Sequence, residues 1–187
     1  MGRRGAIASS RLSGPERAAR GTRRNGAART GPVEPLDSEL APVVATMREF
    51  LDRTEALRVV LLLDRGDAEP VIIDLDAGGE LELAEGDEVR PATLDAFADA
   101  PPRALPPIHP LTPVDVDPEA GQITAPLGAI ERTAAGVRAT AQLFGERSVL
   151  TAAFATTDPD EPLFIAARGD EPLVVSLGGR EWELPER

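Results

Sequence analysis

The stretch that decides the fold is "RVVLLLDRGDAEPVIIDLD", residues 58–76, in which two short apolar runs lie on either side of a turn. The runs "RVVLLL" and "VIIDLD" are short and rich in aliphatic and β-branched residues, which favours buried strands. Between them, Gly66 permits a positive φ, Asp67 can accept backbone hydrogen bonds, and Pro70 delays the start of the next strand. The stretch therefore predicts a β-hairpin.

Nearly the same turn occurs again as "RGDEP" at residues 168–172, between the apolar runs 163–167 and 173–177. Each copy is followed by an apolar strand, a Gly–Gly pair and an alternating acidic strand. In this alignment Gly78 and Gly79 match Gly178 and Gly179, Leu81 matches Trp182, and Leu83 matches Leu184. We interpret the likeness as a duplicated unit of a helix and a three-stranded meander. The alternative is a chance likeness between two segments built from strands and turns.

Two helices are predicted from apolar stripes at helical spacing. The first begins at a capping Asp37, runs to about residue 56, and has a stripe of Leu40, Val43, Val44, Met47 and Leu51. The second is capped by Thr124, ends at Gly145, and has a stripe of Leu127, Ile130, Ala134, Val137, Ala141 and Phe144. A weaker helix is predicted from Thr93.

These elements predict an α+β fold with an antiparallel sheet of about five to seven strands, built from two helix-plus-meander units with the helices mainly on one face. The runs at residues 59–63 and 173–177 are apolar at successive positions, so both faces of the sheet carry apolar residues. The second face therefore needs cover from the proline-rich segment, a small helix or a second subunit. The order of elements resembles, in topology, small profilin-like or roadblock-like regulatory modules.

The chain divides by composition into a tail and one domain. Residues 1–35 mix Arg, Gly, Ala and Ser without hydrophobic periodicity and are predicted to be disordered. Residues 36–187 are predicted to form a single α+β domain. Its halves, 36–90 and 124–187, are joined by a proline-rich linker at 91–123, where seven prolines between residues 101 and 118 exclude a helix or a central strand.

Charge is distributed unevenly and restricts the classes of partner. The formal net charge is −12, but residues 1–30 hold eight Arg and only one acid, so the rest of the chain is strongly acidic. An acidic body repels nucleic acid and favours basic protein partners, which leaves only the tail as a nucleic-acid contact. Neither a long apolar run nor a secretory signal is recognisable, so we expect a cytoplasmic protein without a membrane partner.

Candidate chemistry is sparse. The chain has no Cys and one His, His109, which lies in the proline-rich segment. The segment from Asp74 and Asp76 to Glu85 resembles a calcium loop but has Gly78 where an oxygen ligand belongs. Asp115 and Asp117 form a second acidic group that could hold a hard cation. We therefore expect no catalytic residue, no cofactor and no bound metal, with Asp74, Asp76, Asp115 and Asp117 as the metal candidates.

Trp182 is the single tryptophan, and it lies on a predicted alternating strand near the C-terminus. It is a candidate interface residue because Trp is enriched at binding hot spots, although it could instead close the core beneath a helix. The function we expect is that of a non-enzymatic cytoplasmic protein-protein interaction or regulatory module, which could form a homodimer through sheet faces or edge strands and whose acidic body binds a basic partner. The alternative is a carboxylate-dependent metal-binding protein or enzyme that uses the acidic turn residues.

Overall fold

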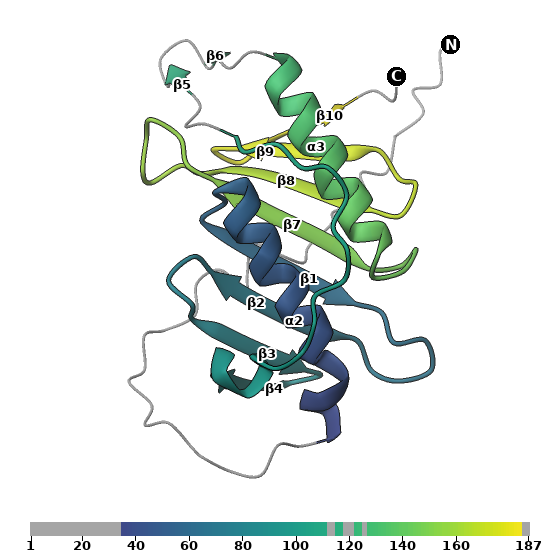
Figure 1. Cartoon of the computed structure of the whole chain (residues 1–187). Helices are drawn as coiled ribbons and strands as arrows, with labels where there is room; N and C mark the ends of the chain where they lie inside the picture. The colour runs from purple at the N-terminus through teal and green to yellow at the C-terminus, as the bar shows by residue number, and fades with distance from the viewer. Residues whose placement is uncertain (1–34, 112–114, 118–121, 125–126, 185–187) are drawn as a thin grey trace, which may run out of the picture.

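A computed structural model describes residues 35–111, 115–117, 122–124 and 127–184, so the predicted tail at 1–35 lies almost wholly outside the described residues. An eight-stranded antiparallel sheet in the order β10-β9-β8-β7-β1-β2-β3-β4 forms its centre (Figure 1). The helices are α2 (Pro35–Thr54), the 3-10 helix η1 (Leu94–Phe97) and α3 (Leu127–Gln142). The strands of the sheet are β1 (Arg58–Leu63), β2 (Val71–Asp76), β3 (Leu81–Glu85), β4 (Glu88–Ala92), β7 (Val149–Phe154), β8 (Leu163–Arg168), β9 (Leu173–Leu177) and β10 (Arg180–Leu184). Strands β5 (Asp115–Asp117) and β6 (Gln122–Thr124) form a separate pair.

The α+β class and the antiparallel sheet are confirmed, but the predicted strand count is wrong. The sheet has eight strands instead of five to seven. Strands β1 to β4 follow one another outward in chain order, and β7 to β10 do so in the opposite direction. The two series meet in the middle, where β1 pairs with β7 and Val60 lies opposite Thr151. The unpredicted strand is β4, which forms at the sheet edge although it contains Pro91.

The two "RGD" turns occupy different places in their series of strands. The first turn joins β1 to β2, whereas the second joins β8 to β9, which are the second and third strands of their series. What the two turns share is their backbone requirement, since φ is +70° at Gly66 and +44° at Gly169. A Cβ atom on Gly169 would also lie 2.5 Å from the carbonyl oxygen of Glu146. At the first turn, the carboxylate that accepts the N–H of Gly66 is Asp64 and not Asp67.

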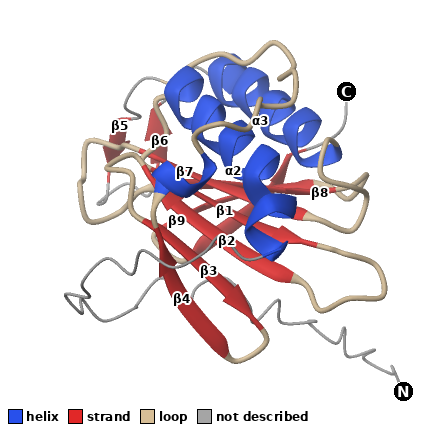
Figure 2. Cartoon of the chain, turned by 60° about the horizontal axis from the view of Figure 1, so that its bottom comes forward, coloured by secondary structure: helices blue, strands red, loops and turns tan. Residues whose placement is uncertain are grey.

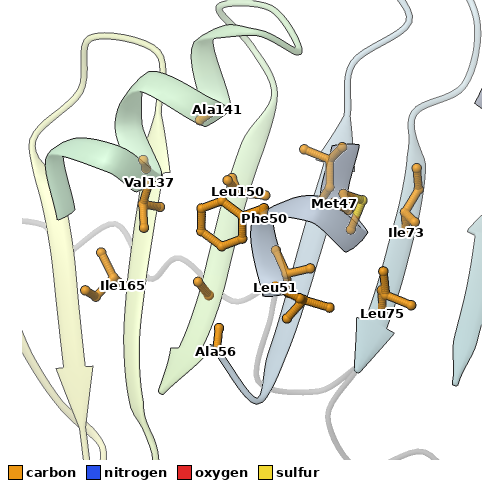
Figure 3. Packing of buried hydrophobic residues seen from close by; sticks show 14 of the residues in the cluster. Met47, Phe50, Leu51, Ala56, Ile73, Leu75, Val137, Ala141, Leu150 and Ile165 are labelled. Atoms are coloured by element: carbon orange, nitrogen blue, oxygen red, sulfur yellow. The ribbon is translucent and has the colours of Figure 1, made fainter. Parts of the chain in front are cut away.

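Both helices lie on the same face of the sheet, α2 over β1 and β2 and α3 over β7 and β8 (Figures 1 and 2). Strand side chains alternate, so the positions facing the helices are buried, as in the pattern of β1, while their neighbours are half-buried. Figure 3 shows Phe50 of α2 beside Leu150 of β7. Val137 of α3 points into the same layer between the helices and the sheet. Phe50, Val137 and Leu150 are completely buried. The core is therefore the single layer between the helices and the sheet.

The helix ends differ from those predicted. Helix α2 begins at Pro35, which places Asp37 inside its first turn instead of at the cap. Thr124 is the last residue of β6, whereas α3 begins only at Leu127. Thr124 is therefore too far from the start of α3 to be its N-cap. Helix α3 ends at Gln142 and not at Gly145, whose φ of +110° belongs to the turn before β7. The apolar spacing located both helices correctly, but the cap signals did not mark their ends.

The proline-rich segment lies over the helices and not on the opposite face of the sheet (Figure 1). The backbone N–H of Arg103 donates to Thr46 Oγ1 of α2 over 2.8 Å. Leu111 is buried and its N–H donates to the carbonyl of Thr54 over 3.4 Å. On α3, Ile108 lies so near Gly136 that an added Cβ would be 3.4 Å from it.

The two repeated arginines have different environments. The guanidinium of Arg65 pairs with Glu85 of β3 over 2.7 Å and with Glu39 of α2 over 3.1 Å, and its side chain is only 17% exposed. Among the described residues, Arg168 forms an ion pair with Glu171 alone, over 3.4 Å, and its side chain is 46% exposed. Arg65 therefore links the β1–β2 turn to the helix layer, whereas Arg168 makes a local contact at the surface.

We predict that Arg65→Ala lowers the free energy of unfolding by about 1 kcal/mol, because two ion pairs and the packing of the long side chain are lost together. Arg168→Ala should change it by less than about 0.5 kcal/mol. Urea denaturation of the two variants measures the difference. Equal losses would contradict the linking role of Arg65.

Candidate protein-binding face of the sheet

The face of the sheet opposite the helices, called here the open face, carries an apolar row that crosses five strands. Residues paired directly across neighbouring strands point to the same side of the sheet. Following the pairs from the β4 edge inward, the row consists of Val89, Ala84, Ile72, Leu62 and Val149. Val89 is 62% exposed, and the other four side chains are half-buried.

Further apolar residues continue this surface toward β9. Val60 pairs with Thr151, Thr151 with Ala166, and Ala166 with Val174. Beside them, Ala153 pairs with Phe164. We call this surface, in which Thr151 carries a hydroxyl and Ala153 is itself buried, the apolar band: Val60, Leu62, Ile72, Ala84, Val89, Val149, Thr151, Ala153, Phe164, Ala166 and Val174. Among the described residues, neither a helix nor a second sheet packs on it (Figure 2).

The rim of the open face is charged and mostly acidic. Arg58 forms a two-armed ion pair with Asp74, in which Nε donates to Oδ1 over 2.6 Å and Nη2 donates to Oδ2. The hydrogen bond to Asp74 raises the pKa of the Arg58 guanidinium, against the opposing effect of burial, with smaller contributions from the charges of Asp74, Glu82 and Asp76. Arg58 is therefore held as a cation whose charge is already matched.

Carboxylates outnumber guanidinium groups on this face. Its acidic positions are Asp74, Asp76, Glu82, Glu181 and Glu183, and its basic positions are Arg58 and Arg168. Glu82, Glu181 and Glu183 are exposed. The open face thus combines an apolar centre with a rim of net negative charge, which is the surface that a partner with apolar and basic residues would complement.

The predicted metal candidates have other environments. Asp74 is paired with Arg58, and Oδ1 of Asp76 accepts the N–H of Glu80 over 2.8 Å, which closes the β2–β3 turn. Asp115 and Asp117 belong to β5, outside the sheet that contains β2. Within the residues whose side chains are described, no group of three or more His, Cys, Asp or Glu is arranged to hold a metal ion.

The other singled-out residues lie apart from the apolar band. His109 is exposed, and its backbone carbonyl accepts a hydrogen bond from Thr133 Oγ1 over 3.3 Å. Trp182 pairs with the buried Val175, so it lies on the side of the sheet that carries the helices, at the β10 edge, and is 37% exposed. The apolar band itself was not predicted residue by residue. Its signal was the consecutive apolar run in β1 and in β9.

A second surface feature is an open depression of about 480 Å³ near the β8–β9 turn. It is lined by Glu146, Arg147, Arg168, Asp170 and Glu171, all of which are exposed. Because these side chains are solvated and carry both charge signs, the depression favours neither an anionic nor a cationic ligand and has no surface shielded from water. The apolar band is therefore the stronger candidate for a functional site.

Comparison with known families, curated proteins and solved structures finds no match to this chain. Neither of the described α-helices is long and apolar enough to cross a membrane. A function for this chain has therefore to be inferred from the chemistry of the open face.

Two neighbouring leucines of β1 test the difference between the faces. Leu61 is completely buried under the helices, and Leu62 is half-buried on the open face. We predict that Leu61→Ala lowers the free energy of unfolding by about 2–5 kcal/mol. Leu62→Ala should lower the free energy of unfolding by less than half as much, because the side chain of Leu62 is already in contact with water in the folded chain. Urea denaturation checks both values, and comparable losses would mean that the open face is covered within one chain.

Proposed function

We propose that this chain is a non-enzymatic interaction module whose open face binds a protein partner. The observation that carries the proposal is the apolar band, which no layer of the described residues covers. A sheet with apolar residues on both sides gains stability when each side is shielded from water. A contiguous exposed apolar patch with a polar rim is typical of protein interaction sites.

The size of the apolar band suits an element of a partner protein. With neighbouring strands about 4.8 Å apart, the seven strands from β4 to β9 span about 30 Å. An amphipathic helix of about 20 residues has the same length. Such a helix would lay its apolar side on the band, and its flanking residues would reach the charged rim.

The charge of the rim favours a basic partner over a second copy of this chain. Two open faces placed together would bring Asp76, Glu82, Glu181 and Glu183 toward one another, and among the described residues of this face only Arg58 and Arg168 could oppose them. Arg58 is already neutralised by Asp74. We therefore propose that the partner presents Arg or Lys residues around an apolar centre, which would also increase the rate of association.

We further propose that the fold consists of two helix-plus-meander units, and that each unit has one helix and a meander of four strands instead of three. The support is that α2 precedes β1 to β4, α3 precedes β7 to β10, and the first strands of the two series pair antiparallel. In this correspondence Asp74 is equivalent to Ala166, and Glu82 to Val174. The two halves of the open face therefore differ in polarity, which would fix the orientation of a partner.

The experiment places a photo-crosslinking amino acid at Leu62 in the chain, which is then irradiated in an extract of its own cells at chosen salt concentrations. Asp52, exposed on α2, is the matched control position. We expect position 62 to give an adduct with a basic protein that position 52 does not give, and the yield should fall at about 0.5 M salt, where exposed charges are screened.

Identical adducts from both positions, or none from position 62, would contradict the binding role of the open face. An adduct of the chain with itself would show that the open face binds a second copy of this chain instead of a basic partner.

A further inference from the structure

We infer that the free edge of β10 accepts an extended basic segment of a partner, which would add to the sheet as a further strand. β10 is one of the two edges of the sheet, and β4 is the other. Such an edge presents unpaired backbone N–H and C=O groups that a peptide strand can use. This inference concerns the edge alone and holds whether or not the open face binds a partner.

The backbone groups that point outward from β10 can be identified from its turn. Gly178 and Gly179, with φ of +55° and +75°, make a two-residue turn, and Leu177 and Arg180 pair across it. The pair that closes such a turn exchanges hydrogen bonds, and bonded pairs then alternate along the hairpin. Arg180, Trp182 and Leu184 consequently turn their backbone groups toward β9. Glu181 and Glu183 turn theirs outward.

The opposite edge is less suited to an added strand. The turn between β3 and β4 is also short, with Glu85 paired to Glu88. The same alternation turns the backbone of Val89 and residue 91 outward, and residue 91 is proline, which has no N–H to donate. Among the described strand edges, β10 therefore offers two outward N–H groups, those of Glu181 and Glu183, whereas β4 offers only that of Val89.

The side chains of β10 define the partner. Glu181 and Glu183 are exposed and lie on the open face, next to Ser176 and Val174. Trp182 lies on the other side of the strand and is 37% exposed. An incoming strand would place its alternate residues beside the two glutamates and the intervening residues beside Trp182. A second β10 would oppose glutamate with glutamate, so the favoured segment alternates Arg or Lys with apolar residues.

Trp182 provides a direct measurement because it is the only tryptophan of the chain. The probe is a blocked synthetic peptide of about seven residues that alternates Arg and Val, added to the full chain. We expect a saturable shift of the tryptophan emission to shorter wavelength as the strand covers the indole. A matched peptide with Glu in place of Arg should produce no shift.

Two variants of the edge separate its charge from its backbone. The double variant Glu181→Lys and Glu183→Lys should weaken binding of the Arg peptide at least about tenfold and should make the Glu peptide the better ligand. Glu183→Pro removes one outward N–H without touching the bonds to β9, but it also removes a carboxylate, so it is compared with Glu183→Gln, which removes the carboxylate alone. The proline variant should bind the Arg peptide about tenfold more weakly than the glutamine variant, with an unchanged circular dichroism spectrum.

Glu82→Lys is the control, since this exposed acid lies on the open face but away from the β10 edge. It should leave the affinity for the Arg peptide nearly unchanged. The inference is overturned if the peptide leaves the emission unaltered at saturating concentration, or if Glu82→Lys weakens binding as much as the two changes in β10. Neither result bears on crosslinking at Leu62, so the edge and the open face can fail separately.

Discussion

The pairing of β1 with β7 is the constraint on which the rest of the structure depends. It joins two series of strands into one sheet of eight and sets which residues of every strand share a face. Because side chains alternate along each strand, placing Leu61 under the helices commits Leu62 to the other side. Two helices and the proline-rich segment cover the first side. The apolar residues on the second side are the direct consequence of this one-sided arrangement.

Much of the fold could be predicted because its signals are local. The apolar runs of β1, β2, β8 and β9 and the stripes of α2 and α3 predicted these elements close to their observed positions. The edge strand β4 could not be predicted, since "EVRPA" lacks apolar alternation and contains Pro91, which only an edge tolerates. The position of the proline-rich segment over the helices depends on long-range contacts, such as that of Arg103 with Thr46, which leave no pattern in the sequence.

The open face could be predicted only as a surplus of apolar residues. Consecutive apolar residues in β1 show that both sides of the strand are apolar, but they do not show which strands lie beside it. Strand order supplies that information and brings Phe164 and Val174 into one surface with Ile72 and Leu62. The pairing of Arg58 with Asp74 likewise changes the interpretation of Asp74, from a candidate metal ligand to half of an ion pair at the rim.

The most direct test of the uncovered face is nuclear magnetic resonance of the methyl groups in the presence of a soluble paramagnetic reagent. Leu61 and Ile73 face the helices, whereas their chain neighbours Leu62 and Ile72 lie on the open face. We expect strong signal loss for the methyl groups of Leu62 and Ile72 and little for those of Leu61 and Ile73. Equal protection of all four would show that the face is already covered within the chain, which would contradict the central claim.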